Sequence, residues 1–160
     1  MADLGVFADA HTVIFERLLL GTPERVWRHL TEPELLSHWL GIALLEPRVG
    51  GRVELHVSDA IVSGTVLEHD PPQRFACSWR ARTLREDLDG LVVFSLEALR
   101  NDTRLVLRHT AHHVRSAAAS ASHWHARLDA LAARLANRAA PDQTASAAEV
   151  LAEYAARLPA

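Results

Sequence analysis

The sequence predicts an α+β fold in which a curved antiparallel sheet wraps around one long C-terminal helix, with two short helices after the first strand. After that first strand and the two helices, a run of about six strand-like segments extends over about 70 residues. An alanine-rich stretch over 116–138 follows, with apolar residues at helical spacing. A sheet with one apolar face must be covered, and this helix is the predicted element long enough to cover it.

The first strand and the two short helices have local sequence signals. The run TVIFERLLL over 12–20 is β-branched and apolar, which is typical of a strand. The tripeptide TPE at 22–24 has the N-cap and first-turn residues of a helix, and TEPE at 31–34 is a second helix start. Residues 1–11 form a leader for which no element is predicted.

The segments after residue 41 alternate between apolar and polar side chains, which describes a sheet with one solvent face and one covered face. They are IALLEPRV, RVELHVS, AIVSGTVLEH, RFACSWRAR, LVVFSLEAL and TRLVLRHTA. The tetrapeptide DLDG at 87–90 predicts a break before the fifth. The clearest alternation assigns to the covered face Phe75, Cys77, Trp79, Leu105, Leu107 and His109.

Two helices are predicted near the C-terminus. The long one carries an apolar stripe of Trp124, Leu128, Leu131 and Leu135. After a break that contains Pro141, a last helix is predicted over 144–158, with an apolar face of Val150, Leu151, Tyr154 and Leu158. That face must be buried, either against its own domain or against a second subunit in a homodimer.

Charge and composition exclude several classes of protein. The formal net charge is −3 and no basic stripe is visible, so we expect no nucleic-acid partner. All 17 cationic residues are arginine, which indicates the codon bias of a high-GC bacterial genome. Without lysine, no side-chain amine is available for Schiff-base chemistry.

The expected compartment is the cytoplasm. Cys77 is the single cysteine, so neither an intramolecular disulfide nor a cysteine-based zinc site is possible, and its position predicts a small buried hydrophobic residue. The first twenty residues lack the pattern of a signal peptide. No apolar stretch approaches the roughly 20 residues of a membrane span.

Six motifs occur in an order that resembles a known family. They are TPERVW at 22–27, LTEPELLSHW at 30–39, GGR at 50–52, GTVLE at 64–68 with PPQRF at 71–75, TRLVLRH at 103–109, and Trp124 with Leu128 and Leu131. Together they resemble the bacterial homologues of the C-terminal domain of the heat-shock-protein 90 ATPase activator, in the START-like, Bet v 1-like (SRPBCC) superfamily of helix-grip folds. The chain departs from the family at His123 and at the AHH segment over 111–113, where glycines are common.

The resemblance implies a helix-grip domain over 12–138 with a C-terminal extension over 139–160. It also implies an internal pocket for a small hydrophobic or amphipathic molecule. The expected lining residues are Trp39, Phe75, Trp79, Phe94, Leu107, His109, Trp124 and Leu128. The alternative is that these side chains only fill the core. His109 is then a hydrogen-bonded core residue; in a pocket it orients a polar group of the ligand or acts as an acid or base.

Other functions stay open as alternatives to binding without chemistry. One is an enzyme of the cyclase, dehydratase or hydrolase type, which would use His109 with His113 or His125. Another is a chaperone partner, which we do not expect, because the eukaryotic activator also uses an N-terminal domain for which this chain has no room. We expect no cofactor, because no glycine-rich phosphate loop is present. We expect no metal site, because the histidines at 109–125 diverge on the predicted elements and have no acidic residue beside them.

Overall fold

The computed structural model describes residues 4–57, 60–82, 87–111 and 117–159. Within these residues, the strands are β1 (Val6–Phe7), β2 (Thr12–Leu19), β3 (Ile42–Leu45), β4 (Arg52–Val57), β5 (Ala60–Asp70), β6 (Arg74–Arg82), β7 (Asp87–Leu99) and β8 (Asp102–Ala111). The helices are α1 (Pro23–Thr31), α2 (Pro33–Leu36), α3 (Ala117–Leu135) and α4 (Gln143–Arg157).

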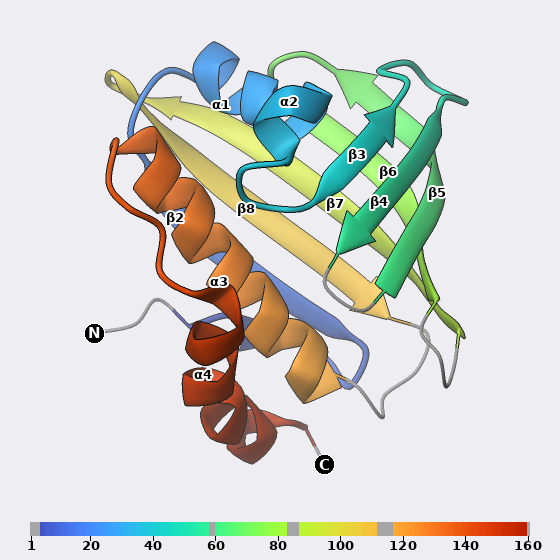
Figure 1. Ribbon diagram of the computed structural model, residues 1–160, viewed down its shortest axis with the longest axis vertical. Helices are drawn as coiled ribbons and strands as arrows, with labels where there is room; N and C mark the ends of the chain where they lie inside the picture. The colour runs from blue at the N-terminus through green and yellow to red at the C-terminus, as the bar shows by residue number, and fades with distance from the viewer. Residues whose placement is uncertain (1–3, 58–59, 83–86, 112–116, 160) are drawn as a thin grey trace.

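One antiparallel sheet forms the body of the fold. Its strand order is β1-β2-β8-β7-β6-β5-β4-β3, so β4 to β8 form a meander of consecutive hairpins. The helix α3 lies across one face of the curved sheet, and α1 and α2 lie beside one end of it (Figure 1). The predicted α+β helix-grip architecture is confirmed. No helix within the described ranges is long and apolar enough to cross a membrane.

The strand β7 begins earlier than the sequence suggested. It starts at Asp87, which pairs with Arg82 of β6, so the break predicted at 87–90 is wrong. An acidic segment is compatible with this strand because its neighbour is basic. The Asp89 carboxylate lies 3.0 Å from Nε of Arg80 on the adjacent strand.

The short helices are fixed by their caps and by Trp39. The Thr22 hydroxyl accepts a hydrogen bond from the backbone N–H of Arg25, and Pro23 occupies the first turn of α1. After α2, the indole N–H of Trp39 donates to the carbonyl oxygen of His29 at 2.8 Å. This buried bond ties the connection into β3 to the end of α1.

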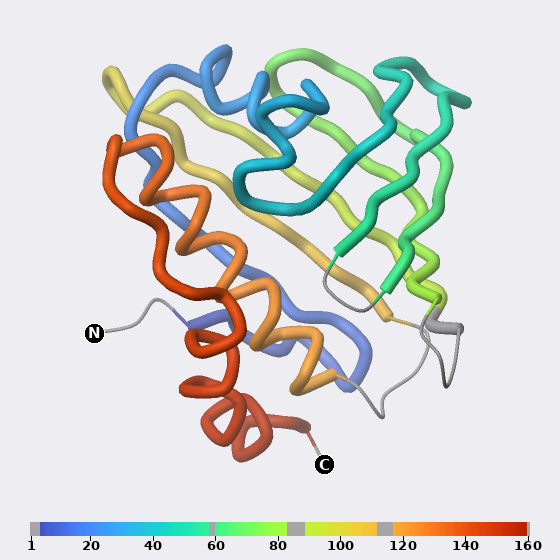
Figure 2. Tube along the Cα trace, in the orientation of Figure 1, coloured from blue at the N-terminus to red at the C-terminus, as the bar shows by residue number. Residues whose placement is uncertain are grey.

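The terminal helix α4 packs on α3 beside the N-terminal strand. Figure 2 shows that β1 and α4 lie on the same side of the molecule. The buried residues of α4 are Ala147, Val150 and Tyr154, whereas Leu151 is 42% exposed. The predicted face was therefore wrong at Leu151, because the stripe that meets α3 runs through positions 147, 150 and 154. The helix covers its own domain, one of the two predicted outcomes.

The Tyr154 hydroxyl joins three parts of the chain. It accepts a hydrogen bond from the backbone N–H of Gly5 at 2.8 Å and lies 2.8 Å from Nδ1 of His125 on α3. The ring of Tyr154 is fully buried and meets the rings of Phe7 and Phe15 edge-on. Burial raises the pKa of Tyr154, so the hydroxyl is protonated near neutral pH.

We predict that Tyr154→Phe lowers the free energy of unfolding by about 1–3 kcal/mol, because it leaves the Gly5 amide without its buried acceptor and removes one contact of His125 Nδ1. Urea denaturation at pH 7 measures this change. Leu151→Ala on the exposed side of the same helix is the control and should stay within about 0.5 kcal/mol of the wild type. Equal stability of the Tyr154→Phe and wild-type proteins would contradict the role of the hydroxyl.

Candidate functional site

Four aromatic side chains meet between the sheet and α3. Trp79 of β6, Phe94 of β7 and His109 of β8 point inward by strand alternation, and Trp124 of α3 faces them. The ring centroid of Trp124 lies 5.1 Å from that of Trp79, 6.1 Å from that of Phe94 and 6.0 Å from that of His109. Such contacts are typical of tilted and edge-on aromatic pairs.

A hydrogen bond from Trp124 fixes the protonation state of His109. The indole N–H of Trp124 donates to Nδ1 of His109 at 2.8 Å, and the Ser120 hydroxyl lies 3.3 Å from the same nitrogen. A nitrogen that accepts a hydrogen bond carries a lone pair, so the proton of the neutral imidazole is on Nε2. Burial lowers the pKa of His109 to about 4, with a further contribution from the positive charge of Arg127. His109 is therefore neutral at physiological pH.

Gly90 allows close packing on the inner face beside this histidine. In the sheet, Gly90 of β7 pairs with Trp79 on one side and with Ala111 on the other. A methyl group on Gly90 would lie 3.0 Å from Nε2 of His109 and 2.7 Å from the carbonyl oxygen of Thr110. The absence of a side chain at this position therefore lets the imidazole and the Thr110 carbonyl approach the strand closely.

A cavity of about 10 Å³ lies on the other side of His109, which is room for about one water molecule. The cavity is lined by Phe7, His11, Val13, His109, Ala111, Ala117 and Ser120. The His11 ring donates from Nδ1 to the carbonyl oxygen of Ala111 at 3.0 Å and so holds the end of β8 to the start of β2. The cavity thus reaches the imidazole from the side of β2.

All eight predicted lining residues are buried, as strand and helix periodicity indicated. Trp79, Phe94, His109 and Trp124 come together in the aromatic cluster. Leu107 and Leu128 lie next to this cluster, since Leu107 pairs with Phe94 and Leu128 is one helical turn from Trp124. Phe75 and Trp39 lie elsewhere: the ring of Phe75 meets that of Trp27, and Trp39 packs beside α1. Their burial is compatible with both a pocket wall and a filled core.

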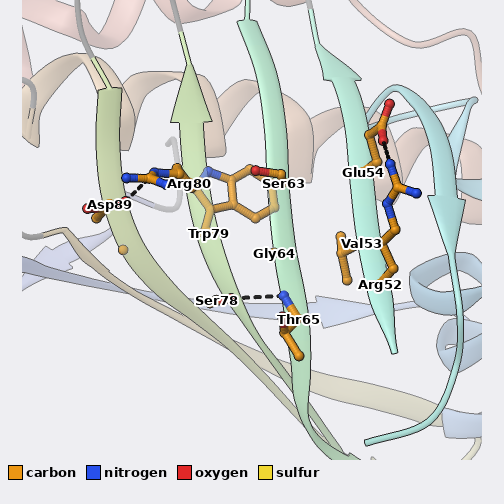
Figure 3. A pocket seen from close by; sticks show the side chains of 11 residues that line it. Arg52, Val53, Glu54, Ser63, Gly64, Thr65, Ser78, Trp79, Arg80 and Asp89 are labelled. Carbon is orange, nitrogen blue, oxygen red and sulfur yellow. Dashed lines mark hydrogen bonds and ion pairs between the residues drawn. The ribbon is translucent and has the colours of Figure 1, made fainter. Parts of the chain in front are cut away.

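A second hollow, of about 590 Å³, opens on the outer face of the sheet (Figure 3). It is lined by Arg52, Val53, Glu54, Ser63, Gly64, Thr65, Ser78, Trp79, Arg80, Asp89 and Gly90. Within it, the Thr65 amide donates to the Ser78 hydroxyl at 2.8 Å. Its charges are paired, Arg52 with Glu54 at 2.7 Å and Arg80 with Asp89 at 3.0 Å. The hollow therefore offers polar groups without net charge.

A partly buried polar network on α3 was not predicted from the sequence. Arg17 of β2 donates to Asp129 at 2.6 Å, and the other carboxylate oxygen of Asp129 lies 3.4 Å from Nε2 of His125. The expectation that no acidic residue lies beside the histidines is therefore wrong at His125. Strand alternation could have revealed Arg17, because it occupies an inward position between Phe15 and Leu19.

Of the histidines expected to act with His109, His125 is engaged elsewhere and His113 lies outside the described residues. Both ring nitrogens of His125 are engaged, one by Tyr154 and the other by Asp129. His112 and His113 lie outside the described residues. Across the part of the chain that the structure describes, no group of three or more His, Cys, Asp or Glu side chains is placed to hold a metal ion.

Comparison with known proteins decides the family. Residues 21–136 match the family described as "Activator of Hsp90 ATPase homolog 1-like protein". The chain belongs to this family. The resemblance derived from the six motifs is confirmed, and the helix-grip fold of the Hsp90 ATPase activator homologues is a ligand-binding fold. Among curated proteins, none matches this sequence.

Several solved structures share the fold. CalU16 from Micromonospora echinospora is 23% identical with a TM-score of 0.76, and the match covers 93% of this chain and 89% of CalU16. The protein encoded by gene BPP1335 from Bordetella parapertussis is 28% identical with a TM-score of 0.71, covering 100% of this chain and 94% of that one. MLL2253 from Mesorhizobium loti is 26% identical with a TM-score of 0.71, covering 79% and 96%.

We predict that Trp79→Ala lowers the free energy of unfolding by about 3–5 kcal/mol, the usual cost of truncating a buried aromatic ring. Trp79 is only 6% exposed and touches two other rings of the cluster. Chemical denaturation measures the effect. Arg80→Ala on the opposite face of the same strand is the matched control, expected to cost about 1 kcal/mol or less. A Trp79→Ala protein as stable as the control would show that the ring is not part of the core.

We predict that acidification destabilises the protein through His109. Its pKa of about 4 in the folded state is below the value of 6.5 for the free side chain. The unfolded chain therefore binds the proton first, and stability is full above pH 6.5 and falls as the pH decreases from 6.5 to about 4. The loss contributed by His109 is about 3 kcal/mol at most.

Urea denaturation at pH 7 and pH 4.5 measures this loss. Burial lowers the pKa of His29 as well, so wild-type protein must be compared with His109→Asn. The variant should lose less stability between the two pH values. The same loss in both proteins would contradict the assignment to His109.

Proposed function

We propose that the protein binds a small apolar or amphipathic molecule between the inner face of the sheet and α3, without chemical conversion. The observation that carries the proposal is a neutral histidine placed among aromatic rings between the sheet and α3. Ligand pockets combine apolar walls with a few placed polar groups in this way. The proposed wall consists of Trp39, Phe75, Trp79, Phe94, Leu107, His109, Trp124 and Leu128.

The end of the sheet near Gly90 is the proposed binding position. Trp79 and His109 are each 6% exposed and flank Gly90, whereas Trp124, Leu107 and Leu128 are fully buried behind them. Room for a molecule larger than water at this position requires the indole of Trp79 to shift.

The chemistry of the core favours binding over catalysis. Nδ1 of His109 already accepts from Trp124, so the lone pair that a general base would need is engaged. A pKa of about 4 leaves the imidazole without the proton that a general acid gives up near neutral pH. Burial raises the pKa of the Cys77 thiol to about 12, so no thiolate nucleophile is available.

Native mass spectrometry of untagged protein, followed by thermal shifts with a panel of apolar aromatic molecules, tests the proposal. We predict a co-purified organic mass, or a melting point raised by a selective ligand at concentrations above its Kd. A Kd near 1 μM with 100 μM ligand would stabilise the fold by about 2.7 kcal/mol. Absence of both an adduct and a shift would contradict the proposal.

Ala111→Leu serves as the blocking variant. Ala111 is half-buried beside Gly90, so a larger side chain there should reduce ligand affinity at least about tenfold while the fold persists. Arg108→Leu adds a similar side chain to the exposed face of β8 and should leave the affinity unchanged. Equal losses in the two variants would count against a binding position at Gly90.

A further inference from the structure

The hollow on the outer face of the sheet has a floor of short residues, Ser63, Gly64 and Thr65 of β5 with Ser78 of β6. A methyl group on Gly64 would overlap the carbonyl oxygen of Ser78, so β5 and β6 lie in close contact at this point and only glycine fits there. The space of about 590 Å³ above this floor is within the size range of small-molecule sites.

The floor offers hydroxyl groups to a ligand. The Ser78 hydroxyl accepts a hydrogen bond from the backbone N–H of Thr65 at 2.8 Å, so its own hydrogen stays available for another acceptor. Ser63 and Thr65 are exposed, and each of their hydroxyls can both donate and accept. The centre of the hollow therefore presents neutral groups of both hydrogen-bonding kinds.

Two arginine–carboxylate pairs form the walls on either side of this floor (Figure 3). On β4, Arg52 lies 2.7 Å from Glu54, whose other oxygen lies 3.2 Å from His56. On the opposite side, Arg80 of β6 lies 3.0 Å from Asp89 of β7. A guanidinium has five N–H donors and a carboxylate has about four lone-pair sites, so each pair keeps donors and acceptors for a ligand. The side chains of the two pairs are 31–66% exposed, which leaves them within reach.

This arrangement selects by hydrogen bonding and not by charge. An ionic ligand that approaches one member of a pair also meets the like charge of the other member. An apolar ligand would displace water from the hydroxyls and charges without replacing its hydrogen bonds. A pyranose sugar avoids both penalties, because neighbouring hydroxyls of its ring can donate to the carboxylate and accept from the guanidinium of the same pair.

We propose that the outer hollow binds a pyranose sugar, held between the two arginine–carboxylate pairs over the hydroxyl groups of β5 and β6. The aromatic cluster lies on the other face of the sheet, so this site goes beyond the proposed function and does not depend on it. A free sugar and a sugar unit of a glycan present the same ring hydroxyls. Each exposed hydrogen bond adds little net free energy in water, so we expect a Kd of about 1–10 mM.

NMR titration of the isotope-labelled full chain tests the inference. The probes are the methyl pyranosides of glucose, galactose and mannose. We expect at least one of them to shift the backbone amide resonances of Ser63, Thr65 and Ser78. No shift with any of the three at about 100 mM, roughly ten times the weakest expected Kd, overturns the inference. Shifts confined to the indole resonances of Trp79 and Trp124 place the sugar on the inner face and also overturn it.

A linear trisaccharide of the sugar that binds separates the two sources of the ligand. Binding at least about tenfold tighter than that of the methyl pyranoside supports the hollow as a site for a glycan chain. Equal affinity supports a site for a single sugar unit.

Two serine variants on the outer face locate the site. Ser63→Leu raises the floor of the hollow and should weaken sugar binding at least about tenfold. Ser95→Leu adds the same side chain to β7, beside Arg74 and outside the hollow, and should bind the sugar as the wild type does. Unchanged affinity in Ser63→Leu, or equal losses in the two variants, overturns the inference. Neither result bears on the pocket proposed between the sheet and α3.

Discussion

The hydrogen bond between Trp124 and His109 connects the long helix to the sheet in the interior of the fold. It satisfies two polar groups that would otherwise be buried at a cost, and it sets the depth at which α3 lies over β8. Around it, Trp79 and Phe94 pack at the angles that aromatic rings favour. The same bond fixes the tautomer of His109, because an Nδ1 that accepts a hydrogen bond leaves the proton on Nε2.

A second, partly buried polar network holds another side of α3. Arg17, Asp129, His125 and Tyr154 connect β2, α3 and α4, so the helix is held by polar contacts at two places. The Asp129 side chain is 37% exposed, so water screens its ion pair with Arg17, and the network orients α3 more than it adds stability.

Sequence patterns predicted the fold well because its main signals are local. Periodicity of two residues identified the inward positions Phe75, Cys77 and Trp79, and the spacing of Trp124 and Leu128 identified the buried side of α3. The extra strand β1, the full length of β7 and the partners of Tyr154 depend on contacts between distant segments, which no local pattern contains. The same limit applies to the site. Alternation of apolar and polar residues along the strand predicted that His109 points inward, but its tautomer depends on the indole N–H of Trp124, which lies on α3. That the eight buried residues line a ligand pocket stays a prediction.

The bond between the Gly5 amide and the Tyr154 hydroxyl imposes an order on folding. Its two partners are 149 positions apart, whereas the central strands pair as consecutive hairpins. Closing long loops costs more chain entropy than closing short ones, so the meander of β4 to β8 can assemble well before this contact forms. β1 pairs through only two residues and gains its second attachment when α4 docks. During synthesis, β1 is thus secured only after α4 has left the ribosomal exit tunnel, although β1 precedes the other described strands in the sequence.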